Sequence, residues 1–308
     1  MSESDNNKSV FVIILTYNNF YDTSITIHSF LKQNKLLKII LVDNNSKDDS
    51  YEKLKIIFSN SVILIQNKEN LGYTGGNNEG IKYALENGAD YIVIANNDIE
   101  FSDPLLTNKL INTHEKYQDI GILGVCQHNG YNKENKAISN KTIFPNSKYK
   151  FNVFKNVQDL PDHIEPVDYV VGFFMFIKKD VFTKAGLFDN EFFLYGEDSE
   201  FGLRAWRKGY KSAIDLSISI FHKGSVSTGN DSPLKYYYKT RNLFLLIHKT
   251  KLNQENHSYF HFYAFKKIVK EIIKLFLSNK PIKYKAKQFS AIIKAFIDIL
   301  FRKTGNNY

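Results

Sequence analysis

The sequence predicts an α/β protein with a mostly parallel, Rossmann-like sheet flanked by helices and followed by a C-terminal helical extension. Two observations lead to this fold class. Short apolar, β-branched runs alternate with helix-like stretches in the first third of the chain. Several of these runs end in polar clusters rich in Asn and Asp. Such alternation favours right-handed βαβ units, which place consecutive strands parallel.

The first half of the chain supplies four strands and three helices in alternation. Apolar β-branched runs predict the strands, and apolar positions at helical spacing predict the helices. The predicted strands are 10–16, 37–42, 62–66 and 91–95, and the predicted helices are 21–33, 49–58 and 77–87. Since ligands bind beyond the carboxyl ends of strands in open α/β sheets, the polar strand ends mark the expected site.

The second half has a less regular pattern. Residues 127–166 are polar and rich in Asn and Lys, which indicates loops, a small hairpin or a mobile flap. The remaining predicted elements are a strand at 169–177, a helix at 197–208 that ends before Gly209, a short strand at 214–221 and a linker at 225–233. We therefore divide the chain into a catalytic domain, 1–232, and a helical region, 233–308.

Composition excludes several classes of protein. With 43% hydrophobic and 24% charged residues, the chain of 308 residues is not disordered. No apolar run approaches the roughly 18 residues of a membrane-spanning helix. The single cysteine, Cys126, excludes an internal disulfide and a zinc site built on several cysteines. We expect a cytoplasmic protein, with attachment to the inner face of the cytoplasmic membrane as an extension of that prediction.

The net charge of +9 is concentrated at the C-terminus. Residues 259–308 hold 11 Lys and Arg against 2 acids, which leaves 30 of each sign in residues 1–258. A neutral body argues against a nucleic-acid-binding protein. Apolar positions at helical spacing in 265–276 and 289–300 predict two amphipathic helices. Either these helices pack on the catalytic domain or a second subunit, or they bind an anionic membrane surface.

Two of the motifs suit a nucleotide. Asp43 ends the second predicted strand, where a carboxylate can bind a base N–H or a ribose hydroxyl; capping of the next turn is the alternative. Residues 70–80, NLGYTGGNNEG, bring glycines before a helix, where free N–H groups can bind phosphate. A tight strand-to-helix turn is the alternative for this second motif.

Three further motifs suit catalysis. Asp98 follows a buried strand, where it can bind Mg²⁺ or Mn²⁺ or form an ordinary turn. Glu197 and Asp198 follow an aromatic run, which indicates a partly desolvated carboxylate able to act as a general base, although helix-terminus electrostatics is the alternative. His222 ends a strand and is a candidate metal ligand, although a lone histidine is more often structural.

In their order and spacing, the segments VIILTYNN, VDNNS, NLGYTGGNNEG, ANND, FFLYGEDSEFGLR and FHKGSVS resemble family 2 inverting glycosyltransferases with a GT-A fold. The resemblance covers roughly residues 10–245 and is strongest to the rhamnosyltransferase-like branch. It implies a metal-dependent enzyme that moves a sugar from a dTDP- or UDP-sugar to a glycan or lipid-linked glycan acceptor.

The resemblance also assigns residues to roles. It implies that Asp198 is the catalytic base with Glu197 as its partner, and that Asp98 and His222 hold Mn²⁺ or Mg²⁺. Arg241 would neutralise donor phosphate or orient an active-site loop. The implied donor-binding residues are Thr16, Asp43, Asn70, Gly72, Gly76, Asn77, Asn97 and Arg241. The chain departs from the branch at Glu200, where Asp is frequent. Asn96 occupies the first position of the family's DXD metal motif, a replacement that is common in this branch.

Two alternatives remain open at this stage. The donor is a UDP-hexose or UDP-N-acetylhexosamine in place of dTDP-rhamnose, or the chain is a nucleotide-sugar-binding subunit without activity. The sequence identifies neither the sugar, the acceptor, the linkage nor the oligomeric state, and a homodimer is one of the arrangements considered. Intact Asp98, Asp198 and His222 argue against a subunit without activity.

Overall fold

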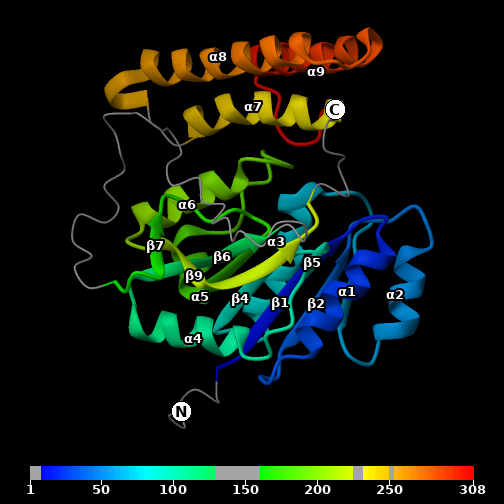
Figure 1. The fold of residues 1–308 in the computed structure, drawn as a ribbon, viewed down its shortest axis with the longest axis vertical. Coiled ribbons are helices and arrows are strands. Elements are labelled where there is room, and N and C mark those ends of the chain that lie inside the picture. The colour runs from blue at the N-terminus through cyan, green and yellow to red at the C-terminus, as the bar shows by residue number, and fades with distance from the viewer. Residues whose placement is uncertain (1–7, 129–159, 225–231, 250–252) are drawn as a thin grey trace.

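The computed structural model describes residues 8–128, 160–224, 232–249 and 253–308 of the 308-residue chain. Its centre is a nine-stranded sheet in the order β3-β2-β1-β4-β8-β6-β9-β5, with β7 paired to β9 (Figure 1). The strands are β1 Val10–Thr16, β2 Lys38–Asp43, β3 Ile63–Gln66, β4 Tyr91–Asn96, β5 Ile99–Glu100, β6 Ile120–His128, β7 Ile164–Val167, β8 Phe174–Lys178 and β9 Lys211–His222.

The sheet has a parallel half and a mixed half. Strands β3, β2, β1 and β4 are all parallel, as the alternating sequence pattern predicts. Strand β8 is antiparallel to both β4 and β6, while β6 and β9 are parallel. Strands β5 and β7 then pair antiparallel with β9. The α/β class is therefore confirmed, and the second half of the sheet adds strand directions that the sequence pattern did not predict.

Helices cover both faces of the sheet. On one face α1 (Phe20–Leu31), α2 (Ser50–Phe58) and α4 (Leu106–Lys116) contribute to one apolar cluster. On the other face α3 (Gly72–Glu86), α5 (Lys179–Ala185) and α6 (Glu197–Arg207) contribute to a second cluster. Strands β1, β2 and β4 are almost fully buried because both faces are covered, which is why they appear as continuous apolar runs in the sequence, whereas the edge strand β3 is only half-buried.

Two predicted elements differ from the structure. Helix α3 begins at Gly72, so most of the predicted glycine-rich turn is the first part of the helix. The strand predicted at 169–177 is only β8, and residues 168–173 lie outside any strand. The linker and the irregular region fall largely on 225–231 and 129–159, outside the described residues.

The C-terminal part forms a separate helical layer at one end of the long axis (Figure 1). It consists of α7 (Pro233–Lys249), α8 (Asn253–Leu277) and α9 (Ile282–Leu300). Helix α7 lies between the other two helices and the α/β body, and it buries Tyr237, Tyr238 and Arg241 almost completely. The predicted helical extension is present, with α7 as an additional inner helix. Within the described part of the chain, no helix has the length and apolar character needed to cross a membrane.

Candidate active site

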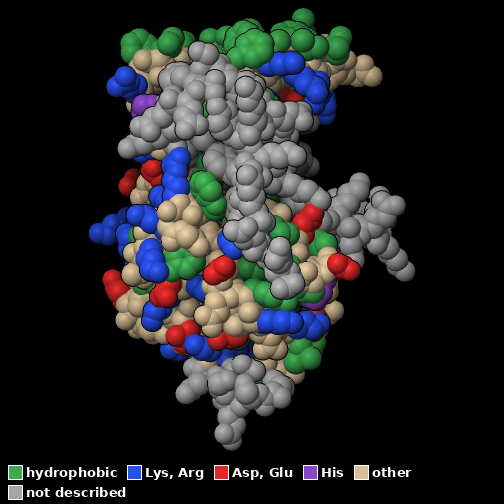
Figure 2. Space-filling model, turned by 90° about the vertical axis from the view of Figure 1, so that its left-hand side faces the viewer, with side chains coloured by type: hydrophobic (Ala, Val, Ile, Leu, Met, Phe, Trp, Pro, Cys, Tyr) green, Lys and Arg blue, Asp and Glu red, His purple; other side chains and the backbone are tan. Residues whose placement is uncertain are grey.

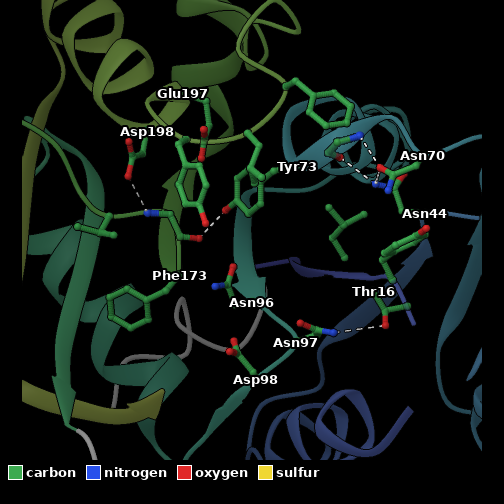
Figure 3. Close-up of a pocket in the computed structure, with 18 of the residues that line it drawn as sticks. Thr16, Asn44, Asn70, Tyr73, Asn96, Asn97, Asp98, Phe173, Glu197 and Asp198 are labelled. Atoms are coloured by element: carbon green, nitrogen blue, oxygen red, sulfur yellow. Dashed lines mark hydrogen bonds between the residues drawn. The ribbon is translucent and has the colours of Figure 1, made fainter. Parts of the chain in front are cut away.

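A cavity of about 370 Å³ opens where β1 and β4 end (Figure 3). Most of its wall is polar strand ends on one side and an aromatic loop with two acids on the other. Predicted site residues in its lining are Thr16, Asn70, Gly72, Asn97, Asp98, Glu197, Asp198 and His222. Other lining residues are Leu15, Tyr17, Asn44, Tyr73, Asn96, Val171, Gly172, Phe173, Phe193, Leu194, Tyr195 and Leu234. The fold therefore brings eight of the twelve predicted residues around one space.

Asp98 and His222 meet because strand β5 pairs with the end of β9. Ile99 lies opposite His222 in that ladder, and the N–H of Lys223 donates to the carbonyl of Asp98 at 3.0 Å. His222 Nε2 lies 3.1 Å from Asp98 Oδ1, and the ring stacks on Phe173 with centroids 4.9 Å apart. The stacked ring holds the imidazole toward the carboxylate.

The Asp98–His222 pair has the features of a cation site. Asp98 Oδ2 accepts a hydrogen bond from the N–H of Gly224 at 3.0 Å. Asp98 Oδ1 is buried and, despite its distance of 3.1 Å from His222 Nε2, takes part in no aligned hydrogen bond in the described structure. A carboxylate oxygen and an imidazole suit Mn²⁺, and the oxygen also suits Mg²⁺. No cluster of three His, Cys, Asp or Glu side chains occurs in the described ranges, so other ligands would come from diphosphate and water.

Glu197 and Asp198 form the first turn of α6, on the side of the cavity opposite Asp98 (Figure 3). Asp198 accepts hydrogen bonds from the N–H groups of Ser199, at 2.7 Å, and Gly172, at 3.3 Å. The hydroxyl of Ser199 is a third donor, at 3.2 Å. Glu197 is buried, and its Oε2 has no hydrogen-bond partner in the described structure. The two neighbouring acids thus occupy different surroundings.

Burial raises the pKa of both carboxyl groups, but to different effect. The pKa of Glu197 rises from 4.5 to about 8, first through burial and then through the charge of Asp198. The pKa of Asp198 is also raised by burial, and its hydrogen bonds to Ser199 and Gly172 oppose that rise. Hydrogen bonds to an ionised carboxylate favour its charged form. The fold therefore supports the ionised form of Asp198 and disfavours the ionised form of Glu197.

Asn44 organises the side of the cavity formed by β2 and α3. Its Nδ2 donates to Asn70 Oδ1 at 2.9 Å and to the carbonyl of Gly72 at 3.0 Å. Its Oδ1 accepts from the N–H of Leu71 and from Asn67 Nδ2, both at 3.0 Å. Asn44 lies in the VDNNS segment but was not among the predicted site residues. Its four partners lie within residues 67–72, about 25 positions further along the chain, and this pairing gives no signal in a single sequence.

Thr16 and Asn97 form a small buried network beside this wall. Thr16 Oγ1 lies 2.9 Å from Thr23 Oγ1, and Asn97 Nδ2 donates to the two hydroxyls at 3.4 and 3.1 Å. Both residues line the cavity at the ends of β1 and β4. Their positions agree with the predicted donor-binding side.

Three predicted donor-binding residues lie behind the cavity wall. Asp43 is fully buried, and its carboxylate accepts hydrogen bonds from the N–H of Ser46, at 3.1 Å, and its hydroxyl, at 2.5 Å. A Cβ on Gly76 would lie 2.4 Å from a methyl of Leu15, so this glycine permits close packing of α3 on β1. Asn77 is also buried, and its Nδ2 donates to the carbonyl of Tyr73 at 2.8 Å.

The N-terminus of α3 does not offer free N–H groups, contrary to the prediction. The N–H groups of Tyr73 and Thr74 both donate to the carbonyl of Phe193, at 2.7 and 3.3 Å. The N–H of Gly72 donates to Asn70 Oδ1 at 2.9 Å. A Cβ on Gly72 would lie 2.5 Å from the backbone carbonyl oxygen of Phe193. The glycine thus serves close approach of the aromatic loop, not of a phosphate.

The aromatic loop 191–196 is held from the helical layer. Phe193, Tyr195 and Gly196 all have positive φ, at 61°, 67° and 91°, and non-glycine residues rarely adopt such values. Asn242 Nδ2 donates to the carbonyls of Phe192, Leu194 and Tyr195, at 2.9, 2.8 and 2.5 Å. Helix α7 therefore fixes the backbone immediately before the two acids.

Arg241 supports the same loop and does not line the cavity. It is 1% exposed, and its Nη2 donates to the carbonyls of Glu191 and Phe192 at 2.8 and 2.9 Å. Its Nη1 donates to the carbonyl of Gly305, after α9, at 2.6 Å. The structure therefore gives Arg241 the second of its two predicted roles, orientation of a loop, in place of phosphate neutralisation.

Comparison with known proteins places this site in a family. Residues 11–183, more than half of the chain, match the family described as glycosyl transferase family 2. The chain belongs to glycosyl transferase family 2. The resemblance to family 2 that the sequence segments carry is thus confirmed, and the curated relatives include enzymes named as hexosyl- and rhamnosyltransferases.

Two curated relatives and one solved structure illustrate the match. The chain is 25% identical over 261 residues to the dTDP-rhamnosyl transferase RfbF of Shigella flexneri, covering 79% of this chain and 81% of that protein. It is 22% identical over 239 residues to the N-acetylglucosaminyl-diphospho-decaprenol L-rhamnosyltransferase of Mycobacterium tuberculosis, covering 68% and 74%. The mannosyltransferase PcManGT of Pyrobaculum calidifontis, solved with GDP-Man and Mn²⁺, superposes with a TM-score of 0.62 at 13% identity, covering 97% and 89%. This likeness confirms the GT-A fold.

Proposed function

We propose that this glycosyltransferase moves a sugar, with inversion, from a nucleoside-diphosphate sugar to a hydroxyl group of a glycan or lipid-linked glycan, and that it depends on Mn²⁺ or Mg²⁺. One observation carries the proposal. The Glu197–Asp198 pair and the Asp98–His222 pair face the same cavity from opposite sides. A base and a cation site on two sides of one space suit attack at a carbon with departure of a diphosphate.

Rhamnose is the proposed sugar, carried by dTDP, and surface polysaccharide synthesis is the proposed setting. The curated relatives from Shigella flexneri and Mycobacterium tuberculosis, both named rhamnosyltransferases, support this choice. The second name also supports a lipid-linked acceptor, since it specifies a diphospho-decaprenol. A UDP-hexose or UDP-N-acetylhexosamine is the competing donor.

Asp198 is the proposed general base. As the more readily ionised member of the pair, it accepts the proton of the acceptor hydroxyl. The hydroxyl oxygen then bonds to the anomeric carbon as the bond from that carbon to the diphosphate oxygen breaks. A single displacement inverts the anomeric configuration. Protonated Glu197 adds no second negative charge beside the base, so the pair carries one charge at neutral pH.

Asp98 and His222 would hold the divalent cation, which when bound neutralises the negative charge that builds on the departing diphosphate. Asp98 is buried and the His222 ring is stacked on Phe173, which would fix the two ligand atoms before the donor arrives. The Thr16–Asn97 network and the wall formed by Asn44, Asn70 and Gly72 would orient the nucleotide. Phe173 and the aromatic loop would exclude water from the reacting groups.

A thermal-shift panel tests the donor and the cation together. The donors are dTDP-rhamnose, UDP-glucose, UDP-galactose, UDP-N-acetylglucosamine and GDP-mannose, each with and without Mn²⁺. A ligand that binds only the folded protein raises its melting temperature. We expect a rise with dTDP-rhamnose that needs Mn²⁺ and that disappears in Asp98→Asn. A rise of the same size in EDTA would contradict the proposed cation site.

Turnover separates the enzyme from a binding subunit without activity. The wild type and Asp198→Asn are incubated with the donor that binds and with lipid-linked glycan acceptors, and release of nucleoside diphosphate is measured. We expect release by the wild type only, with donor binding retained by the variant. Binding without turnover on any acceptor would favour the binding subunit.

A further inference from the structure

Helices α8 and α9 expose an apolar surface at the end of the molecule opposite the α/β body (Figures 1 and 2). In Figure 2 hydrophobic side chains line this end, with Lys and Arg directly below them. We call this surface the outer face and define it by its exposed apolar residues. They are Phe262, Phe265, Ile273, Phe276 and Leu277 of α8, with Ile282, Ile293, Ile297, Leu300 and the adjacent Phe301 at α9.

The outer face is a consequence of how the two helices pack. Both rest on α7, and Phe244 of α7 contacts His261 of α8 and Phe296 of α9. Phe276 and Phe289 meet edge to face, with centroids 5.6 Å apart, and so join the two apolar stripes. The opposite sides of the helices bury Ala264, Ile268, Ala291 and Ile292. Each helix therefore has apolar residues on its inner side and on the outer face.

Several apolar side chains of the outer face are almost fully exposed. Leu277 is 79% exposed, Ile282 is 84% and Leu300 is 80%. A contiguous apolar patch rimmed by charge marks an interaction surface in most soluble proteins.

Positive charge surrounds the outer face. Residues 259–308 hold 11 Lys and Arg against two acids, Glu271 and Asp298. Glu271 is paired with Lys274 at 3.1 Å. Asp298 is buried and binds the Tyr237 hydroxyl at 2.6 Å and Lys294 at 3.0 Å. Exposed lysines next to the apolar stripes include Lys266, Lys270, Lys283 and Lys287.

We propose that the outer face binds an anionic membrane surface, with its apolar residues in the interface and its lysines at the lipid headgroups. Apolar side chains ringed by lysines match an anionic bilayer in both polarity and charge. A second copy of this chain would bring two basic surfaces together, because Asp298 is buried and Glu271 is the one exposed acid that residues 260–308 offer against their lysines. Within the described residues no helix could span a bilayer, so the helices would lie along its surface.

Vesicle flotation of the full chain tests this proposal without any sugar donor, so its result is independent of the proposed reaction. Vesicles of phosphatidylcholine with phosphatidylglycerol are compared with vesicles of phosphatidylcholine alone. We expect binding to the anionic vesicles, reduced by added NaCl because salt screens the lysines. The variant Leu277→Glu/Leu300→Glu should bind about tenfold less or weaker still, since two apolar contacts are replaced by charges that anionic lipid repels.

Ile56→Glu is the matched control. Ile56 lies on α2, outside the helical layer, and is 79% exposed, as Leu277 is. The Ile56→Glu variant should bind the anionic vesicles as strongly as the wild type does. A second variant, Lys270→Gln/Lys283→Gln, keeps the apolar residues but removes two positive charges. It should lose binding to the anionic vesicles, while its behaviour with vesicles of phosphatidylcholine alone should match that of the wild type. Circular dichroism verifies that every variant is folded.

Three results would overturn the proposal. The first is no binding of the full chain to anionic vesicles. The second is equal binding by Leu277→Glu/Leu300→Glu and the wild type. The third is a dimer of the wild type in light scattering that this variant converts to a monomer, which would assign the outer face to a second copy.

Discussion

Glu197 and Asp198 are neighbours in the sequence, but the fold gives them different hydrogen-bond partners. Loss of a general base typically lowers the rate about 10²–10⁴-fold. We expect that loss in Asp198→Asn, measured as turnover at saturating donor and Mn²⁺. Glu197→Gln should retain most turnover near pH 7, because Gln has the shape and neutral charge of protonated Glu197. Equal losses in the two variants would contradict this division of roles.

The raised pKa of Asp198 predicts a pH effect on turnover. The base works only in its ionised form, and burial raises its pKa above the ordinary value of 3.8. Turnover should therefore fall on the acid side at a higher pH than an exposed aspartate would give. The measurement is the pH dependence of kcat, with donor and metal saturating at each pH. An acid limb at the ordinary aspartate pKa would contradict it.

The raised pKa of Glu197 predicts that stability falls as pH rises, whereas turnover should rise with pH on the acid side. Between its ordinary pKa of 4.5 and about 8, the folded chain holds a proton that the unfolded chain releases. The free energy of unfolding should therefore fall as pH rises through this window, by at most about 1.4 kcal/mol per pH unit. Urea unfolding at several pH values measures the slope. Glu197→Gln should flatten it, and an unchanged slope would assign the dependence to other groups.

For individual residues, the sequence predicted the charged side chains of the site well but the side chains that hold them in place poorly. Asp98, His222, Glu197 and Asp198 stand in short motifs, and the structure brings all four to one cavity. Asn44 and Asn242 were missed because their roles depend on carbonyl groups from other segments. In a single sequence, an asparagine that is bound to solvent cannot be distinguished from one that is bound to three backbone carbonyls.

The loop 191–196 is the element on which the site depends most. Its left-handed residues hold their shape through Asn242, and its Phe193 carbonyl accepts the first N–H groups of α3. One loop therefore connects the donor wall, the acid pair and the helical layer.

Asn242→Ala should reduce both stability and turnover. Each carbonyl that is buried without a partner costs about 1–3 kcal/mol. The variant removes the Asn242 donor from the carbonyls of Leu194 and Tyr195, while the Phe192 carbonyl keeps its bond from Arg241. We expect kcat to fall even at temperatures where circular dichroism shows the variant fully folded. Ile292→Val, in the buried side of α9, is the control for stability alone and should cost about 1 kcal/mol without a change in kcat. Normal kcat in folded Asn242→Ala would remove the positioning role.

Helix α3 illustrates why the glycine-rich segment was assigned to a turn. Glycine is a poor helix former, so local propensity favours a loop at 72–76. Tertiary packing reverses this preference, because Gly76 and Gly80 would each clash with β1 if they carried a Cβ. The requirement for a close approach between helix and sheet is not visible in the local pattern.

At the scale of the whole molecule, the predicted division at residue 232 cuts through the support of the active site. Arg241, Asn242 and Gly305 all lie in the helical region and all bind the 191–196 loop or its neighbours. We expect a chain ending at residue 232 to lose turnover, because the loop before Glu197 loses these hydrogen bonds. The measurement compares its turnover with that of the full chain at equal concentration. A folded, active fragment would contradict this dependence.

The α/β architecture itself was predictable because it follows from alternation of apolar strands with helices. The mixed half of the sheet was not, since strands β5, β6, β7 and β9 pair across long stretches of chain and their directions depend on closure of the edge. The basic C-terminal helices were also predictable, and the structure adds which of their sides is covered by α7.

Closure of the sheet by β9 would also determine when the proposed cation site forms during synthesis. Asp98 Oδ1 and His222 Nε2 lie 3.1 Å apart although the two residues are far apart in the chain, and the short β5–β9 ladder joins the backbone next to Asp98 to His222. A ribosome-bound chain that has not yet released β9 contains Asp98 without its histidine. If this pair holds the proposed cation, the nascent polypeptide would acquire affinity for the metal late, after most of the proposed nucleotide-binding half has been made.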